Sequence, residues 1–309
     1  MEREFRWEDP DAQTVYDYGC LERDLRRLED CYPGLEIGVA GQSVLGQNLY
    51  YLRLGTGPHQ VFYNAAHHAN EWLTGMLLMR FAAAAAAARA AGGRIGGYPA
   101  AQLWNQSSLY LMPLVNPDGA DLLAGTVSPE RFEKQLGVSG AADRLPLERI
   151  WKANIRGVDL NLNYPAGWET AKAYERAQGI SGPAPSDYGG PAPLSEPETA
   201  AVAAFTRQHN FRLVLALHSQ GRVIYWQYAD QTPPGASSIA QALAAASGYG
   251  LEANPSDASH AGYKDWFIQE FGRPGFTVEV GTGQNPLPVS DLAAIYREIL
   301  PLLVLAALL

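Results

Sequence analysis

Apolar residues along the chain fall into short continuous runs separated by longer stretches with a helical period. The short runs predict strands, and several are apolar throughout, as in strands buried on both faces. The longer stretches end at glycine or proline, which predicts helices. The predicted strands cover residues 35–41, 48–55, 109–116, 211–219 and 275–281, a third strand begins the segment 60–68, and 222–228 is a further candidate. The predicted helices cover 12–31, 71–91, 195–209, 237–250, 263–271 and 291–309.

The alternation of strands with helices predicts an α/β fold in one domain over residues 1–309. Because several strands are apolar on both faces, we expect a mixed, largely parallel sheet covered by helices on both sides. Residues 120–195 are rich in Gly, Pro and Ser and are expected to be mostly loop, after a turn at 117–119. The next helix is expected to open with a capping box, with Ser195 as N-cap and Glu198 three residues on.

The composition is that of a globular protein and limits the kinds of partner and site. The 309 residues are 47% apolar, and 23 Lys and Arg stand against 32 Asp and Glu, for a formal net charge of −9. This excess of acid argues against a nucleic acid partner, because such binders carry basic patches. Cys20 and Cys31 are the two cysteines. In one helix they lie about 16 Å apart at ~1.5 Å per residue, beyond disulfide reach, so no disulfide and no cysteine-rich metal site is expected.

The apolar stretches are too short to predict insertion in a membrane. Residues 81–91 and 300–309 are the longest of them, and a bilayer needs about 20 apolar residues. The first ten residues are charged and contain no apolar run, so no export signal is visible. We therefore expect a cytoplasmic protein, or an extracytoplasmic one if a targeting segment has been removed ahead of residue 1.

Histidines and a glutamate cluster where the third predicted strand ends, at His67-His68-Ala69-Asn70-Glu71. Zinc takes imidazole nitrogen and carboxylate oxygen as ligands. His68 and Glu71 are three residues apart, and His67 and Glu71 are four apart, so both pairs can converge on one point. The spacing leaves both histidines open as ligands.

His218 lies at the carboxyl end of the apolar strand 211–217. Ligands of open α/β sheets gather at the carboxyl ends of strands. Alone, this histidine could equally be a core residue satisfied by one hydrogen bond. Together with His68 and Glu71 it completes a set of two histidines and one glutamate, which is typical of a catalytic zinc site.

Glu279 lies inside the apolar run 275–281. A carboxylate in such a run is costly unless it is paired or functional. Burial would raise its pKa towards the range of a general base. The alternative is a buried salt bridge.

The longer motifs resemble the zinc metallocarboxypeptidases of the carboxypeptidase A type. The resemblance runs through most of the chain, in the order and spacing of that family. It implies a twisted, mixed eight-stranded sheet between helices. It also implies that His68, Glu71 and His218 bind one zinc ion and that Glu279 is the catalytic base, which favours His68 over His67. The matching segments are GVAGQSVLGQNLYYLRLG, HHANEW, LVNPDG, GVDLNLNYP, PLSEPET, LALHS, DWF and FTVEVG.

Several departures from this family change the expected specificity. Asn161 is kept, but Leu162 replaces the arginine with which the carboxypeptidases grip a substrate's C-terminal carboxylate, and a leucine cannot make that contact. Asn70 replaces a second arginine. Lys152 stands where the family has the arginine that polarises the scissile carbonyl, so the charge is kept and we expect Lys152 to stabilise the oxyanion. The family's substrate-capping tyrosine aligns with Asp257.

A bacterial subgroup, the γ-D-glutamyl-diaminopimelate peptidases, is similar in residues 151–161, 218–226 and 262–269. This resemblance implies hydrolysis of the γ-D-glutamyl–meso-diaminopimelate amide in peptidoglycan stem peptides, as part of muropeptide processing or recycling. The substrate would then be a peptide or muropeptide. We expect contacts to it from several polar residues, for each of which the alternative is a solvated surface position: Asn161, Asp257, His260, Tyr263 and Arg222.

Three other functions stay open from the sequence. A carboxypeptidase that acts on ordinary C-termini is disfavoured by Leu162. A zinc deacylase of small N-acyl amino acids would use the same metal chemistry. A non-catalytic binding module is disfavoured because the set of His68, Glu71, His218 and Glu279 is complete.

Overall fold

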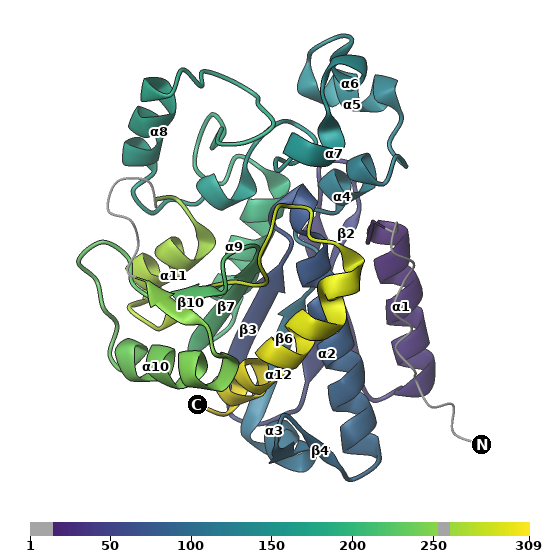
Figure 1. Ribbon diagram of the computed structural model, residues 1–309, viewed down its shortest axis with the longest axis vertical. Helices are drawn as coiled ribbons and strands as arrows, with labels where there is room; N and C mark the ends of the chain where they lie inside the picture. Colours follow the sequence, from purple (N-terminus) through teal and green to yellow (C-terminus); the bar gives the residue numbers. More distant parts are fainter. Residues whose placement is uncertain (1–14, 253–259) are drawn as a thin grey trace.

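The fold is built on one eight-stranded sheet (Figure 1), and the computed structural model describes residues 15–252 and 260–309. The strands lie in the order β1-β2-β6-β3-β7-β10-β8-β9. This confirms the predicted mixed sheet in a single α/β domain. The strands are β1 (Glu36–Gln42), β2 (Asn48–Leu54), β3 (His59–Ala65), β6 (Ser107–Met112), β7 (Leu213–His218), β8 (Val223–Tyr225), β9 (Gly250–Glu252) and β10 (Gly275–Glu279), and a separate hairpin is formed by β4 (Arg94–Ile95) and β5 (Tyr98–Pro99).

The centre of the sheet is parallel, and this decides where functional groups can gather. Strand β3 pairs in parallel with β6 on one side and with β7 on the other, and β7 pairs in parallel with β10. The outer strands β1, β2 and β8 are antiparallel to their inner neighbours. The carboxyl ends of β3, β7 and β10 therefore meet at one edge of the sheet, which is where ligands of such sheets bind.

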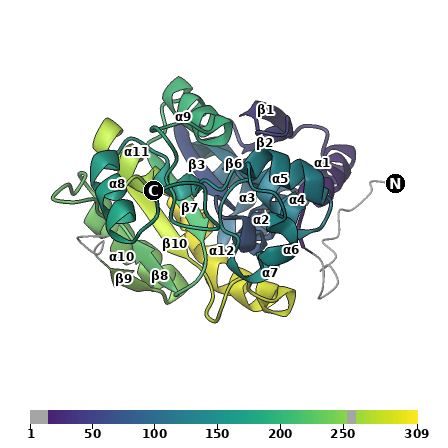
Figure 2. The ribbon, with the colours of Figure 1, turned by 90° about the horizontal axis from the view of Figure 1, so that it is seen from above.

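Helices cover both faces of the sheet (Figures 1 and 2). One apolar core lies between the sheet and α1, α2, α3, α10 and α12, and a second lies between the sheet and α9 and α11. The bounds of the helices on these two faces are α1 (Tyr18–Cys31), α2 (Leu73–Ala90), α3 (Ala100–Gln106), α9 (Pro197–Gln208), α10 (Ala236–Ser247), α11 (Tyr263–Phe271) and α12 (Leu292–Leu308).

Helix α2, with the short turn before it, is long and apolar enough to cross a bilayer when judged by length and composition alone. In the fold, 67% of its most apolar window is buried. It packs against the sheet and α12, as a core helix of a globular domain does.

Residues 120–195 are mostly loop and turn, as the composition suggested, but short helices that were not predicted interrupt the loops. Their helices are short and carry few apolar positions, so no long helical period marks them in the sequence. The segment 117–119 is also not a free turn, because Pro117 is compatible with the first turn of a helix and Asn116 caps that helix through its side chain. The helices and turns of this region are α4 (Pro117–Leu123), α5 (Pro129–Leu136), α6 (Ala141–Arg144), α7 (Leu147–Ile150), η2 (Leu160–Leu162) and α8 (Trp168–Ala177).

The predicted capping box at α9 is wrong. The helix begins at Pro197 with Glu196 as N-cap, and no side chain caps it. Ser195 instead donates its hydroxyl to Glu196 Oε1 at 3.0 Å, and Glu198 accepts the backbone N–H of Val44 at 3.1 Å. The Glu198 side chain, which the local pattern assigned to the cap, therefore bonds to a distant part of the chain instead. The two cysteines are both free, as expected.

Candidate active site

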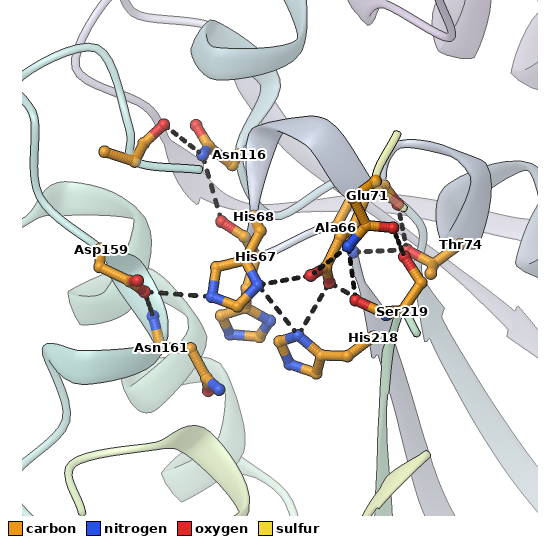
Figure 3. A network of polar contacts seen from close by, with 12 residues as sticks. Ala66, His67, His68, Glu71, Thr74, Asn116, Asp159, Asn161, His218 and Ser219 are labelled. Carbon is orange, nitrogen blue, oxygen red and sulfur yellow. Dashed lines mark hydrogen bonds and ion pairs between the residues drawn. The ribbon is translucent and has the colours of Figure 1, made fainter. Parts of the chain in front are cut away.

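The polar groups of the site lie at the carboxyl ends of three neighbouring strands. After β3 the chain turns at Ala66, whose φ is +54°, and the short turn η1 (Ala69–Glu71) follows His68. The hydroxyl of Thr74 accepts the N–H of Ala66 at 3.0 Å and donates to the carbonyl of Glu71 at 2.7 Å. These bonds hold His68 and Glu71 on one turn and direct both side chains to the same side (Figure 3).

The turn that carries Glu71 is held against α4. Gly119 donates its N–H to Asn116 Oδ1 at 3.0 Å, and a Cβ at this glycine would lie 2.7 Å from Ala69 Cβ. The side-chain amide of Asn116 also donates to the carbonyl of His67 and to that of Ala153, both at 3.1 Å. One asparagine thus ties the loop of the histidines to the loop of Lys152.

His68, Glu71 and His218 converge on one point (Figure 3). His68 Nδ1 lies 2.9 Å from Glu71 Oε1, and His218 Nδ1 lies 3.0 Å from Glu71 Oε2. The two Nδ1 atoms are 3.3 Å apart. One donor atom from each of the three residues lies within 4.8 Å of the others, which is the arrangement of a three-ligand metal site.

Asp159 fixes the state of the His68 ring. Its Oδ1 lies 3.1 Å from His68 Nε2. A carboxylate only accepts, so Nε2 carries a hydrogen, and Nδ1 is the nitrogen whose proton a metal ion at the centre would displace. The N–H groups of Asn161 and Asp187 bond to the same carboxylate, at 3.1 and 3.4 Å.

The charges at the centre favour a cation. Burial lowers the pKa of His68, but the carboxylates of Glu71 and Asp159 outweigh burial and raise it to about 10. Burial opposes the charge of Glu71, yet His68 and His218 hold the pKa of this carboxyl well below its usual range. Two carboxylates thus attract positive charge to a point where two imidazole nitrogens also converge. The donor set and the charge both fit a divalent zinc ion.

Further contacts orient Glu71. The backbone N–H of Ser219 donates to Glu71 Oε2 at 3.2 Å, and the amide of Asn285 donates to Oε1 at 3.3 Å. The hydroxyl of Ser219 donates to Asn285 Oδ1 at 2.8 Å. This carboxylate is therefore held in place from two directions.

His67 lies beside the centre and does not belong to it. Its Nε2 is 2.9 Å from the hydroxyl of Tyr164, and its ring is fully buried. Burial, followed by the charges of His218 and His68, lowers its pKa well below the usual range. The alternative pair of His67 with Glu71 is therefore not formed.

Glu279 is the last residue of β10, and its Cα pairs with that of His218. It lies at the end of the strand and is partly exposed, whereas the sequence suggested a position inside the strand. Burial, and after it the charge of Glu71, raises its pKa to about 8, against the opposing effect of His68 and Lys152. Burial lowers the pKa of Lys152, but the carboxylates of Asp159, Glu71, Asp187 and Glu279 outweigh it and raise that pKa.

The residues that were predicted to contact the substrate do not lie together in the structure. Asn161 lies next to the centre, and its Oδ1 accepts the N–H of Tyr263 at 3.1 Å. His260 lines a cavity beside Leu162. Asp257 lies outside the described residues.

Two of the predicted contacts do not face this centre. Tyr263 is fully buried in the core, and its hydroxyl is 3.0 Å from Thr206 Oγ1, so it offers no surface to a substrate. Arg222 pairs with Glu298 of α12 at 3.4 Å and lies over the ring of Tyr249.

Two supporting residues were not found from the sequence. Asp159 lies in the GVDLN stretch, 91 positions from His68, and that motif was its only signal. Asn285 lies in an irregular segment after β10 that has no hydrophobic period. Both act through ligand residues that only the fold brings near them.

Comparison with known proteins assigns the family. The model of the zinc carboxypeptidase family matches residues 21–301. The γ-D-glutamyl-L-diamino acid endopeptidase 1 of Lysinibacillus sphaericus is 41% identical over 303 residues, which cover 95% of this chain and 72% of the relative. Thrombin-activatable fibrinolysis inhibitor shares the fold with a TM-score of 0.72 at 19% identity, over 96% of this chain and 76% of that one. For the carboxypeptidase A of Helicoverpa armigera the TM-score is 0.69 at 19% identity, over 95% and 73%. The chain belongs to the zinc carboxypeptidase family and is a metallopeptidase.

Proposed function

We propose that this chain is a zinc peptidase that hydrolyses the γ-D-glutamyl–meso-diaminopimelate amide of peptidoglycan stem peptides. The observation that carries the proposal is the set of His68, Glu71 and His218 beside Glu279 at the strand ends. The relative with 41% identity, which is named a γ-D-glutamyl-L-diamino acid endopeptidase, supports the substrate.

The zinc ion would be held by Nδ1 of His68, a carboxylate oxygen of Glu71 and Nδ1 of His218. Bound there, zinc would polarise the scissile carbonyl and lower the pKa of a water molecule to about 7. Asp159 keeps the His68 ring in the required tautomer, and Asn285 with Ser219 keeps Glu71 in place. These residues position the ligands.

Glu279 moves the proton. One of its carboxylate oxygens accepts a proton from the attacking water, whose oxygen bonds to the carbonyl carbon of the amide. The C–N bond then breaks, and Glu279 gives the proton to the leaving amine. One water is consumed, and a carboxyl group and an amine are formed, so Glu279 ends in its starting state.

Lys152 supplies positive charge to the carbonyl oxygen as that oxygen becomes negative. Its backbone is fixed on both sides, because its carbonyl accepts the N–H of Ala69 at 2.9 Å and its N–H donates to the carbonyl of Pro185 at 2.8 Å. A γ-glutamyl amide is chemically an ordinary amide, so this machinery suffices for it. Leu162 has no donor for a C-terminal carboxylate, so it cannot recognise an ordinary peptide C-terminus in the way that the family's arginine does.

The test separates chemistry from metal binding. Glu279→Gln should keep the bound zinc and lose hydrolysis of L-alanyl-γ-D-glutamyl-meso-diaminopimelate, and full activity would overturn the role of Glu279. His218→Ala should lose zinc as measured by elemental analysis. His59→Ala is the matched control, because His59 lies at the amino end of β3, the far end of that strand from the centre. Equal zinc content in all three proteins would overturn the metal site.

A further inference from the structure

A cavity of about 180 Å³ opens beside the metal centre, between η2 and α8. Its apolar wall includes Leu162 and Ile180, and the exposed ring of Tyr174 lies at its border. Its polar wall is formed by Glu175, Asp187 and His260. The proposed metal ligands and Glu279 do not include any of these residues.

The cavity is joined to the metal centre through Asp159. The N–H of Asp187 donates to Asp159 Oδ2 at 3.4 Å, while Oδ1 of the same carboxylate holds His68. Leu162 lies in the same short turn as Asn161, whose N–H also bonds to Asp159. A substrate whose amide lies at the metal centre therefore has this cavity next to it.

The two carboxylates in the cavity differ in their partners. Glu175 is buried and accepts from the ammonium group of Lys172 and from the N–H of Gly189, so its charge is balanced. Asp187 is exposed, and within the described residues its carboxylate accepts only the hydroxyl of Ser186, at 2.6 Å. The charge of Asp187 reaches Lys152, but within residues 15–252 and 260–309 no ion pair joins the two. The negative charge of the Asp187 carboxylate is therefore available to bind a cationic group of a ligand.

The backbone at Asp187 is left-handed, with φ at +65°. Aspartate adopts this conformation less readily than glycine, and such conformations are concentrated at functional sites. Here it accompanies the bond from the Asp187 N–H to Asp159.

His260 adds a possible donor for an anion. Its Nδ1 lies 3.1 Å from the hydroxyl of Tyr228, which leaves Nε2 as the ring atom for a ligand in the cavity. An imidazole N–H can donate to a carboxylate. The cavity therefore offers one group for an ammonium, one for a carboxylate, and an apolar wall for methylenes.

We propose that this cavity is the subsite for the side chain of the diamino acid, with Asp187 binding its ammonium group and His260 its distal carboxylate. The inference rests on the proposed function and names the residues that select the substrate. The D-glutamyl residue is a poor occupant, because its nitrogen is acylated and it has no ammonium group for Asp187. The charge of the cavity therefore selects the diamino acid on the amine side of the scissile bond.

The test uses three substrates that differ only in this side chain: L-alanyl-γ-D-glutamyl peptides ending in meso-diaminopimelate, L-lysine or L-norleucine. Asp187→Asn should lower kcat/KM for the first two about tenfold more than for the norleucine peptide, since one charge-assisted contact is lost. Asparagine accepts the left-handed conformation, so the variant keeps the loop. His260→Gln should lower kcat/KM for meso-diaminopimelate several-fold more than for lysine.

The matched control is Asp30→Asn on α1, which lies across the molecule from α8 in both views (Figures 1 and 2). It should leave all three values unchanged. An equal loss for the three substrates with Asp187→Asn, or no loss, would overturn the subsite while leaving the proposed function standing. If wild-type enzyme loaded with zinc cleaves none of the three peptides, the proposed function fails and the subsite fails with it.

Discussion

The buried carboxylate of Glu198 makes the stability of this fold depend on pH in a direction that can be measured. Glu198 has no exposed surface, accepts the N–H of Val44 at 3.1 Å and accepts the amide of Asn154 at 3.4 Å. Burial, and after it the charge of Asp118, raises its pKa from 4.5 to about 8. Asn154 belongs to the loop of Lys152, so this network also supports the active site.

The direction in which stability changes with pH depends on whether the folded or the unfolded state binds the proton of Glu198 more tightly. The folded state holds it more tightly than the unfolded chain, so the stability from Glu198 is fully present below about pH 4.5 and is lost as the pH rises through about 8. The difference between a pKa of 4.5 in the unfolded chain and about 8 in the folded protein corresponds to about 5 kcal/mol when both states are ionised. Of this contribution to the free energy of unfolding, about 1 kcal/mol is already lost at pH 5 and about 3 kcal/mol at pH 7.

Glu198→Gln removes this titration, and denaturant unfolding at pH 5, 7 and 9 measures the result. The free energy of unfolding of the variant minus that of the wild type should rise by about 2 to 3 kcal/mol from pH 5 to pH 7, and by about 4 kcal/mol from pH 5 to pH 9. The glutamine amide faces Asn154, which adds an offset that does not depend on pH. Val202→Ala, at a buried position of the same helix, should destabilise by the same amount at each pH. A difference for Glu198→Gln that is constant with pH would refute the reasoning.

Three further predictions concern the site. Asp159→Asn should weaken zinc binding about 10- to 100-fold in a chelator competition, because the negative partner of the His68 ring is lost; an unchanged affinity would contradict its positioning role. Lys152→Ala should lower kcat about 10²-fold or more with a small change in KM, and Lys152→Arg should recover part of the loss, whereas a change in KM alone would contradict the oxyanion role. Tyr164→Phe should lower the free energy of unfolding by about 1 kcal/mol without changing zinc content, since it removes the partner of His67; loss of zinc would make His67 part of the metal site.

Most of the metal centre could be predicted from local signals in the sequence, and the resemblance to the family was needed to choose His68 over His67. His68 and Glu71 lie on one turn, and His218 lies at the end of an apolar strand, so the general rule for parallel sheets brings them together. The alternation of apolar runs likewise predicted the strands β7 and β10 and the helix α11 with nearly their observed bounds, and it predicted the start of β3.

Contacts between distant segments could not be predicted in this way. Asp159 reaches His68 across 91 positions, and Glu198 leaves its local capping pattern for the N–H of Val44. Tyr263 looked like a substrate contact because it lies near the motif, but the packing of α11 on the sheet buries it. The hydrogen-bond partners and the burial of these side chains depend on which distant segments the fold places side by side.

The most direct test of the proposed activity is the release of free meso-diaminopimelate from L-alanyl-γ-D-glutamyl-meso-diaminopimelate, measured by mass spectrometry. The wild-type enzyme should release the diamino acid and L-alanyl-D-glutamate, should stop doing so when a chelator removes the metal, and should resume when zinc is added. No release by the zinc-loaded enzyme, or release that a chelator leaves unchanged, would contradict a zinc peptidase centred on His68, Glu71 and His218.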